Sequence, residues 1–229
     1  MKKLKTSWSY IKGNEPDVVK KILSGLSLRV RRQQFGTFLK IIQPKKEDKV
    51  VDIGVSSVEP LPDINFFEKN YPYLEKLTAV SIDALLDFKK KYPKIKFVQV
   101  IPDKPLPFAD NTFNIVVSWA TLEHVGDKKQ QEFFLKEIFR IGKKIFVTTP
   151  YRGCPYEPHS GLFFVHWLPR KWFEKICRFL GKSFWASEKN LRCLWKKELE
   201  ELLPDPKKTK ILTYKIFGLI PSHLMIFKT

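Results

Sequence analysis

Apolar residues along the chain gather into short runs with two different periodicities. Five runs are rich in β-branched and aromatic residues and almost continuously apolar, which is typical of strands buried on both faces of a parallel sheet. These runs span residues 49–53, 77–82, 95–100, 113–119 and 144–149. Helical stretches lie between them, and the clearest covers residues 127–142, where apolar side chains lie opposite Lys and Glu. Strands that alternate with helices predict a doubly wound, three-layer α/β/α sheet with right-handed crossovers.

Other patterns flank these strands. Residues 16–43 predict a basic helix, and residues 168–181 and 188–203 predict two amphipathic helices after the fifth strand. The last two runs, "KILTYKIFGLIP" and "SHLMIFKT", predict an antiparallel pair of strands interrupted around Pro221. The sheet is therefore expected to be mostly parallel, with an antiparallel C-terminal end.

The length of 229 residues suits a large domain with a substantial core, and 43% apolar content with 14% aromatics indicates a folded globule. We expect a basic N-terminal helical segment (1–48) packed on a core domain (49–229) that carries a helical insertion over about 151–203. Three cysteines form no CxxC pair, which favours a reducing compartment. The start lacks an apolar signal core, and apolar runs stay shorter than about 18 residues, so we expect a cytoplasmic protein.

The net charge is +18, and the excess is concentrated near the N-terminus. Thirteen lysines and arginines meet four carboxylates among the first 49 residues. This imbalance predicts a surface for an anionic partner, such as nucleic acid, phospholipid headgroups or a phosphate-bearing substrate. A solvated, lysine-rich surface without a partner explains the same composition equally well.

In doubly wound sheets, ligands bind beyond the carboxyl ends of the strands. Candidate binding residues just after the predicted strands are Asp52, Gly54, Ser56, Asp83, Asp103, Trp119 and Ala120. A glycine there lets the backbone approach a ligand closely, because no Cβ intervenes. A carboxylate can accept hydrogen bonds from both hydroxyl groups of a ribose.

The stretch "LPFADNTFNIVVSWATLEHVGDKKQQEFFLKEIFRIGKKIFVTTP" carries a specific pattern: a turn, the fourth strand, a Leu-Glu-His segment, a helix and a strand that ends in Thr-Pro. With the loop "VVDIGVSSVEP", it resembles the class I S-adenosylmethionine-dependent methyltransferases of the type 11-like domain, from about Lys49 to the C-terminus. The "DIGV" loop, a segment with Asn65, Glu68 and Tyr71, and a later "HWLP" element are similar to a branch associated with polysaccharide and glycolipid biosynthesis.

This resemblance implies a Rossmann-like fold and S-adenosylmethionine as the cofactor. It places Gly54 and Ser56 at the methionine end, Asp83 at the ribose and Asp103 at the adenine. Trp119 and Ala120 then line the sulfonium side, where an aromatic face attracts a cation, although packing in the core explains Trp119 as well. Most such enzymes have further glycines where this chain has Val55, Ser56 and Ser57.

Methyl transfer to a hydroxyl group needs positioning and a base. The candidate bases are His124, Glu157 and His159, although a histidine such as His124 is also suited to a backbone hydrogen bond beneath the pocket. Glu157, His159 and His166 could instead bind a metal, but no ligand pair at helical spacing supports this, so we assign no metal.

The aromatic run "LFFVHWLPRKWF" with Arg170 and Lys171 suits either a membrane interface or a packed lid. We therefore expect a methyltransferase for a hydroxyl group of an anionic saccharide, lipid-linked saccharide or other small acceptor, peripheral at the inner face of the membrane through its basic N-terminal segment. The first alternative is an RNA methyltransferase, favoured by charge but lacking an Asn-Pro-Pro-Tyr element and an RNA-binding module. The second is a non-catalytic cofactor-binding or scaffold protein, suggested by the missing glycines.

Overall fold

The computed structural model describes residues 17–229, so the lysines expected to contact a partner at positions 2–12 lie outside the described residues. A mixed sheet in the order β3-β2-β1-β4-β5-β9-β8 forms the centre. Its strands are β1 (Val50–Ile53), β2 (Leu77–Ser81), β3 (Lys96–Gln99), β4 (Phe113–Trp119), β5 (Gly142–Pro150), β8 (Lys210–Ile216) and β9 (Ile220–Lys228). Strands β1 to β5 are parallel, and β9 is antiparallel to both of its neighbours. The predicted Rossmann-like sheet with an antiparallel C-terminal end is confirmed.

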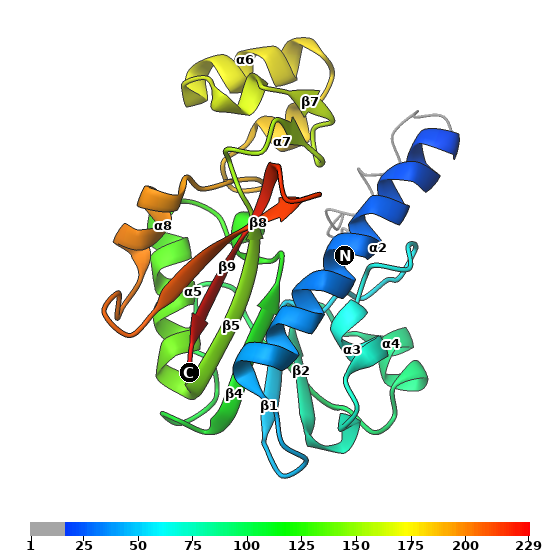
Figure 1. The fold of residues 1–229 in the computed structure, drawn as a ribbon, viewed down its shortest axis with the longest axis vertical. Helices are drawn as coiled ribbons and strands as arrows, with labels where there is room; N and C mark the ends of the chain where they lie inside the picture. The colour runs from blue at the N-terminus through cyan, green and yellow to red at the C-terminus, as the bar shows by residue number, and fades with distance from the viewer. Residues whose placement is uncertain (1–16) are drawn as a thin grey trace.

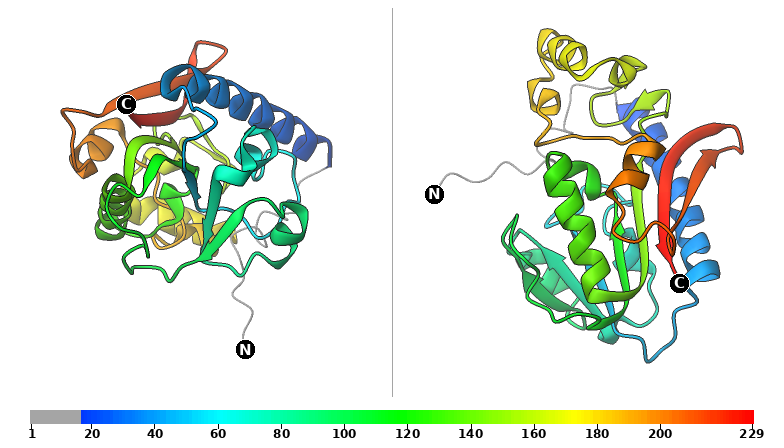
Figure 2. Two further views of the ribbon diagram at one scale, coloured as in Figure 1. Left: turned by 90° about the horizontal axis from the view of Figure 1, so that it is seen from below. Right: turned by 90° about the vertical axis from the view of Figure 1, so that its left-hand side faces the viewer.

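Helices cover both faces of this sheet (Figures 1 and 2). Those that connect or precede the parallel strands are α2 (Asp17–Ile42), α3 (Phe66–Asn70), α4 (Leu86–Lys91) and α5 (Lys128–Ile141), with short 3-10 turns η1 (Leu74–Lys76) and η2 (Leu122–His124). Neighbouring strand residues point to opposite faces, as Val50 packs with α2 and Val51 packs with α5. The continuous apolarity of the strands therefore reflects burial on two faces.

A cap, residues 151–195, lies beyond the carboxyl ends of β4 and β5 (Figure 1). Its elements are β6 (Tyr156–Glu157), β7 (Leu162–Phe163), η3 (Val165–Trp167), α6 (Arg170–Phe179) and α7 (Ser183–Ala186), and α8 (Lys196–Leu202) follows it. Phe173, Cys177 and Trp185 lie in a small apolar core that belongs to the cap alone. The cap therefore packs around its own core and meets the sheet along one seam.

The predicted helix over residues 188–203 is wrong in its first half, because α8 begins only at Lys196. The preceding segment is irregular and forms main-chain hydrogen bonds to other elements. Arg192 N donates to Glu123 O at 2.8 Å, and Arg152 N donates to Leu194 O at 3.0 Å. These tertiary bonds replace the helical ones.

The C-terminal pair of strands is confirmed, but it turns earlier than predicted. The turn lies at Phe217 and Gly218, both with positive φ. Pro221 lies within β9, opposite Lys215, where the register of the pair shifts. Proline has no amide hydrogen and cannot donate to the neighbouring strand. The irregular register at this point of the pair accommodates it. Among the described helices, none is both long and apolar enough to cross a membrane.

Arg140, near the end of α5, holds the loop that leads into β4. Its guanidinium donates to Phe108 O at 2.7 Å, Leu106 O at 3.1 Å and Asp110 Oδ1 at 2.9 Å. Glu137 accepts from the same guanidinium at 2.7 and 2.8 Å, and from Leu106 N at 2.7 Å. One planar fork therefore satisfies two loop carbonyls and two carboxylates.

We expect Arg140→Ala to lower the free energy of unfolding by about 2–4 kcal/mol, because it leaves buried acceptors without a donor. Arg140→Lys should recover less than half of this loss, since an ammonium group cannot reproduce the fork. Urea unfolding measures both. Lys136→Ala, which removes an exposed partner of Glu132 on the same helix, is the matched control and should change stability by less than about 0.5 kcal/mol. Equal effects of Arg140→Ala and Lys136→Ala would contradict the clamp.

Candidate functional site

The loop after β1 turns at Gly54, which has a φ of +103° that favours glycine. A Cβ at this position would lie 2.1 Å from Thr121 Oγ1, so the missing side chain makes room for the residue that follows β4. The amides of Gly54 and Val55 donate to Val80 O at 2.9 and 3.1 Å. The glycine therefore joins the ends of β1, β2 and β4.

Side-chain hydrogen bonds hold the rest of this loop, where a glycine-rich loop would rely on backbone conformation. Asn65 Oδ1 accepts from Ser56 N and its Nδ2 donates to Ser56 O, both at 3.0 Å. The Ser56 hydroxyl donates to Val58 O at 2.8 Å, and the Ser57 hydroxyl donates to Asp83 Oδ2 at 2.9 Å. Ser56 thus shapes the loop with both its amide and its hydroxyl, and its predicted contact with the cofactor stays a prediction.

Asp83 is half-buried after β2, and only one of its carboxylate oxygens accepts from Ser57. Two apolar side chains flank it: Ile82 is 59% exposed, and Ile101 is 70% exposed. They lie on adjacent strand ends, since Ser81 pairs with Gln99 and Ser81 O accepts from Val100 N. A carboxylate beside uncovered apolar side chains fits a ribose and an adenine ring.

Asp103 also follows β3, but it lies at the surface with both carboxylate oxygens accepting from Gln130 Nε2, at 3.0 and 2.9 Å. Gln130 forms the capping box of α5 with Asp127. Asp103 therefore stabilises the start of α5 through Gln130. Its predicted contact with the adenine stays a prediction.

Asp52 and Glu68 form a buried pair of carboxyl groups beneath the loop. Burial, followed by the neighbouring Glu68, raises the pKa of Asp52 well above its usual range. Burial also raises the pKa of Glu68 to about 7, and Glu68 Oε1 has no hydrogen-bond partner. Two neighbouring buried carboxyl groups cannot both be ionised at low cost. The pair therefore holds one proton between them near neutral pH.

Trp119 and Ala120 end β4. The Trp119 ring packs on Phe38, Phe67 and Phe146 at centroid distances of 6.3, 5.8 and 5.4 Å, so core packing accounts for most of the ring. Its indole nitrogen is buried without a partner. Ala120 has a φ of +51° and donates its amide to Thr148 O at 2.8 Å, which turns the chain toward η2.

The three candidate bases lie together where the cap meets the sheet. His124 Nε2 lies 3.1 Å from His159 Nε2, and His159 Nδ1 lies 2.7 Å from Glu157 Oε1. His124 Nδ1 lies 2.8 Å from Asn190 O, so the backbone hydrogen bond considered for this histidine is present as well. His124 therefore forms one hydrogen-bonded row with Glu157 and His159, which lie 33 and 35 positions later in the chain.

The pKa values of the two histidines in this row shift in opposite directions. Burial and the neighbouring His159 lower the pKa of His124. Burial also disfavours a charged His159, but the Glu157 carboxylate outweighs it and raises the pKa of His159 overall. His159 and Ser160 together outweigh burial at Glu157 and lower its pKa to about 2. Positive charge in the row is therefore held at His159, beside an ionised Glu157.

Sequence reasoning missed Glu123 and Arg31. Glu123 is fully buried, its Oε2 accepts from Thr149 Oγ1 at 3.0 Å, and its Oε1 has no hydrogen-bond partner and lies 3.8 Å from His124 Nε2. Its position, after a buried strand and directly before His124, could have identified Glu123 as a candidate site residue. Arg31 of α2 is within electrostatic reach of Glu123, Asp52 and His159, and burial lowers its pKa.

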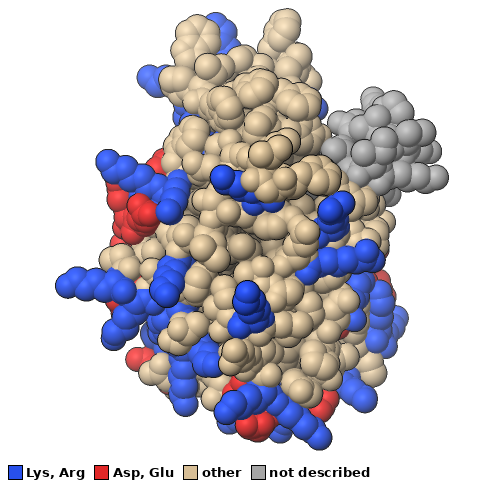
Figure 3. Space-filling model, in the orientation of Figure 1, with Lys and Arg blue, Asp and Glu red and all other residues tan. Residues whose placement is uncertain are grey.

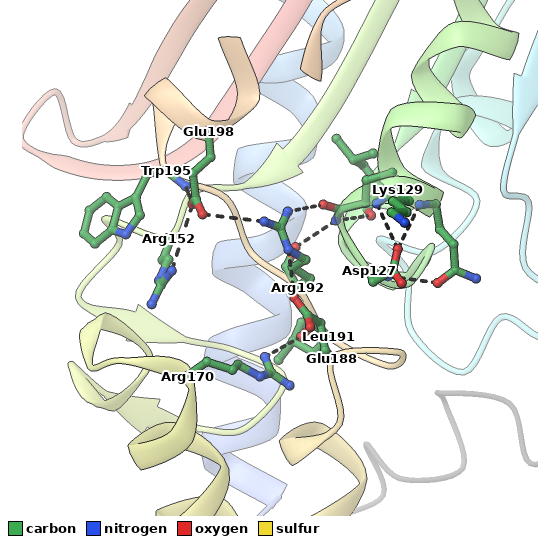
Figure 4. A network of polar contacts seen from close by, with 12 residues as sticks. Asp127, Lys129, Arg152, Arg170, Glu188, Leu191, Arg192, Trp195 and Glu198 are labelled. Carbon is green, nitrogen blue, oxygen red and sulfur yellow. Dashed lines mark hydrogen bonds and ion pairs between the residues drawn. The ribbon is translucent and has the colours of Figure 1, made fainter. Parts of the chain in front are cut away.

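A network beneath the cap fixes the backbone on both sides of this row (Figure 4). Buried Gln131 donates to Leu122 O at 2.8 Å and to Arg192 O at 3.0 Å, and it accepts from Arg192 Nη1 at 2.6 Å. In Figure 4, Arg192 lies centrally, between Glu198 and Glu188. The segment that supplies Asn190 O is thereby tied to the segment that carries Glu123 and His124.

A cavity of about 170 Å³ lies beside this network, away from the β1 and β2 loops, and Glu157 at the end of the histidine row is one of its lining residues. Three of its lining residues, Arg152, Arg170 and Arg192, donate to carbonyl or carboxylate oxygens of the protein. Because these charges are paired internally, we assign the cavity a structural role and place the candidate site at the strand ends.

Residues 47–145 match the family model described as "Methyltransferase domain". None of the curated proteins with which the chain was compared is significantly similar in sequence. Among solved structures, the PH0226 protein from Pyrococcus horikoshii is 15% identical, with 96% of this chain and 94% of that chain covered and a TM-score of 0.53. A SAM-dependent methyltransferase from Aquifex aeolicus is 14% identical, with coverage of 94% and 98% and a TM-score of 0.52.

A third similar structure is a complex of the Haloferax volcanii Trm112 methyltransferase activator with a methyltransferase. Identity is 13%, with 86% of this chain and 88% of that chain covered and a TM-score of 0.52. At these identities the structural similarity shows the fold alone, and the family model matches residues 47–145 of it.

The Asp52–Glu68 pair makes stability depend on pH. Because the folded-state pKa of Glu68, about 7, lies above its usual value of 4.5, its contribution to stability is complete below about pH 4.5 and is lost as the pH rises through 7. We expect Glu68→Gln to be about 1–3 kcal/mol more stable than the wild type at pH 8, with a smaller difference at pH 5. Urea unfolding at both values measures this.

The exposed Glu75→Gln variant is the control for the loss of one carboxylate. It should follow the wild type at both pH values. A Glu68→Gln variant whose stability runs parallel to the wild type from pH 5 to pH 8 would show that the pair does not share a proton.

Proposed function

We propose that the chain is a class I S-adenosylmethionine-dependent methyltransferase that methylates a hydroxyl oxygen of an anionic small-molecule acceptor, a saccharide or lipid-linked saccharide; the methyltransferase-domain match over residues 47–145 supports the first part. The observation that carries the proposal is the row His124–His159–Glu157 at the carboxyl ends of β4 and β5, next to the cofactor loops. An oxygen acceptor must lose a proton, and this row is built from groups that accept and hold one.

The residues at the strand ends fit the cofactor. Asp83 would hold the ribose, with Ile82 and Ile101 against the adenine, and the turn at Gly54 would approach the methionine end. When bound, the cofactor supplies the methyl carbon, which the acceptor oxygen attacks while the carbon–sulfur bond breaks and leaves its electron pair on sulfur. The buried Asp52–Glu68 pair supplies negative charge beneath this position.

On the acceptor side, the protein holds the proton that the hydroxyl group loses. His124 Nδ1 donates to Asn190 O, so its Nε2 carries a lone pair, and this atom faces His159 Nε2 at 3.1 Å. His159 lies next in the row, and ionised Glu157 stabilises positive charge on it. A proton taken up by the histidine pair is therefore held beside a carboxylate.

An anionic acceptor is supported by Arg31. Its Nη1 is buried without a hydrogen-bond partner, and no carboxylate of the described residues lies within 4.0 Å of it. Asp63 is the carboxylate that stabilises the charge of Arg31 most, but a buried nitrogen without a hydrogen-bond partner is still costly. A phosphate or carboxylate of the acceptor would remove that cost at a position close to His159 and Glu123.

A lipid-linked acceptor is supported by the outer face of the cap. Phe163, Phe164, Trp172 and Phe179 are each more than half exposed, and basic residues Lys171, Lys175 and Arg178 lie among them on α6. The upper part of the molecule in Figure 3 is correspondingly poor in acidic side chains. Exposed aromatic rings beside cations are suited to the headgroup region of an anionic membrane.

Methyl transfer is tested with S-adenosylmethionine labelled in its methyl group and fractionated cell extract as the source of acceptors. We expect label in a glycan or lipid-linked glycan fraction, and His159→Gln should lower the rate by at least about 100-fold while calorimetric binding of S-adenosylhomocysteine is unchanged. Asp83→Asn should weaken that binding instead, whereas Asp87→Asn, an exposed carboxylate on α4, should not. Label confined to RNA, or no transfer by a chain that binds the cofactor, would refute the proposed acceptor.

Membrane contact is tested by sedimentation with vesicles. The chain should bind vesicles that contain phosphatidylglycerol, bind pure phosphatidylcholine weakly, and lose binding as salt increases. Trp172→Ser with Phe179→Ser should lower binding to anionic vesicles by at least about tenfold, because both rings leave the interface. Leu212→Ser, which removes an exposed apolar side chain of β8, is the matched control. Binding that survives the double substitution would locate the contact elsewhere.

A further inference from the structure

The two histidines of the row face each other in an arrangement that needs a positive species between them. His124 Nδ1 lies at a carbonyl oxygen and His159 Nδ1 lies at a carboxylate oxygen, so both Nδ1 atoms carry hydrogen and donate. In the neutral tautomers this leaves a lone pair on each Nε2, and these atoms are 3.1 Å apart. Two lone pairs at that distance repel unless a proton or a metal ion lies between them.

A third acceptor is directed at the same place. Glu123 is fully buried, and its Oε1 has no hydrogen-bond partner although it lies 3.8 Å from His124 Nε2. Burying a carboxylate oxygen without a partner costs free energy that a bound cation would recover. Among the described residues, Glu123, His124 and His159 form a set whose ligand atoms all lie within 4.8 Å of one another.

The partners around these residues are those of metal-binding histidines. A histidine that binds a metal usually donates its other ring nitrogen to a carboxylate or a backbone carbonyl, which fixes the ring and its tautomer. Here Glu157 holds His159, Asn190 O holds His124, and Thr149 holds the other oxygen of Glu123. The carboxylates Glu123 and Glu157 also supply two negative charges, which balance a dication.

We propose that Glu123, His124 and His159 bind a divalent transition-metal ion of the zinc type. Two nitrogen ligands 2.0–2.1 Å from a tetrahedral zinc ion lie about 3.3 Å apart, close to the 3.1 Å between these nitrogens. Two imidazoles and one carboxylate are a known ligand set for catalytic zinc, whereas magnesium prefers oxygen ligands. The sequence alone led to no metal assignment, because the set considered there, Glu157, His159 and His166, has no ligand pair at helical spacing, and Glu123 and His124 were not considered as ligands.

The three ligands leave a fourth position, which a zinc site of this kind gives to water or a substrate oxygen. The site lies at the seam between the cap and the ends of β4 and β5. Its use for acceptor binding rests on the proposed function; the metal site itself does not. A hydroxyl group bound there would have a lowered pKa and would release its proton to water, because the Nε2 atoms of His124 and His159 would then be metal ligands and could not take it up.

The experiment uses the full chain without a histidine tag. After dialysis against zinc and removal of free metal, we expect about one zinc per chain by mass spectrometry of the metal content, and visible absorption bands of tetrahedral cobalt after exchange with Co²⁺. Glu123→Gln and His124→Ala should each weaken zinc binding by more than about 100-fold, and Glu157→Gln by about 10- to 100-fold through loss of the partner of His159. Glu123→Gln keeps the shape of the side chain, so it separates loss of a ligand from loss of the fold.

His166→Asn is the matched control, since His166 is a buried histidine of the cap that bonds to Cys154 O and lies outside the set. It should retain zinc. Zinc or cobalt that fails to bind, that binds equally to Glu123→Gln and His124→Ala, or that is replaced by magnesium would overturn the proposal. Metal binding is measured without cofactor or acceptor, so zinc that binds while no methyl transfer occurs would refute only the proposed function. Full transfer by a metal-free chain would refute only the use of the metal for acceptor binding.

Discussion

Parallel pairing of β1 to β5 directs all five carboxyl ends to one edge of the sheet, and nearly every feature of the site follows from that edge. The chain leaves the sheet there five times, and each exit needs partners for its main-chain groups. Gly54 and Val55 share the carbonyl of Val80, and Ala120 uses that of Thr148. Polar side chains that follow these exits are therefore gathered without having been adjacent in sequence.

The protein balances buried charge in two different ways, at opposite edges of the sheet. Glu137 and Arg140 form a fully bonded ion pair that holds a loop, and burial there costs little because every group has a partner. Glu68, Glu123 and Arg31 each retain a buried polar atom without a partner. The arginines of the network beneath the cap all have partners, although His166 Nδ1 beside them does not.

The strands and most helices could be predicted because their apolar patterns are local. Residues 113–119 form β4 as the pattern predicts, because the run is apolar at most positions and both of its faces are buried. The segment before Lys196 could not be predicted, because its bonds to Glu123 and Arg152 belong to other elements. His124, Glu157 and His159 could be named individually from their places after strands, but their mutual contact depends on how the cap folds back. Glu123 was missed because the sequence around it does not show that its carboxylate is buried and that one of its oxygens has no hydrogen-bond partner.

The cap is one uninterrupted stretch of the chain, whereas the groups that fit the cofactor come from the stretches around β1, β2 and β3. Glu157, His159 and Asn190 all belong to the cap, and His124 and Glu123 meet them from the sheet. Changes in the gene that are confined to one segment of about 45 codons would therefore reshape the face presented to an acceptor and leave the cofactor loops intact. The fold thus places the groups proposed to face an acceptor and the groups that fit the cofactor on separate stretches of the chain.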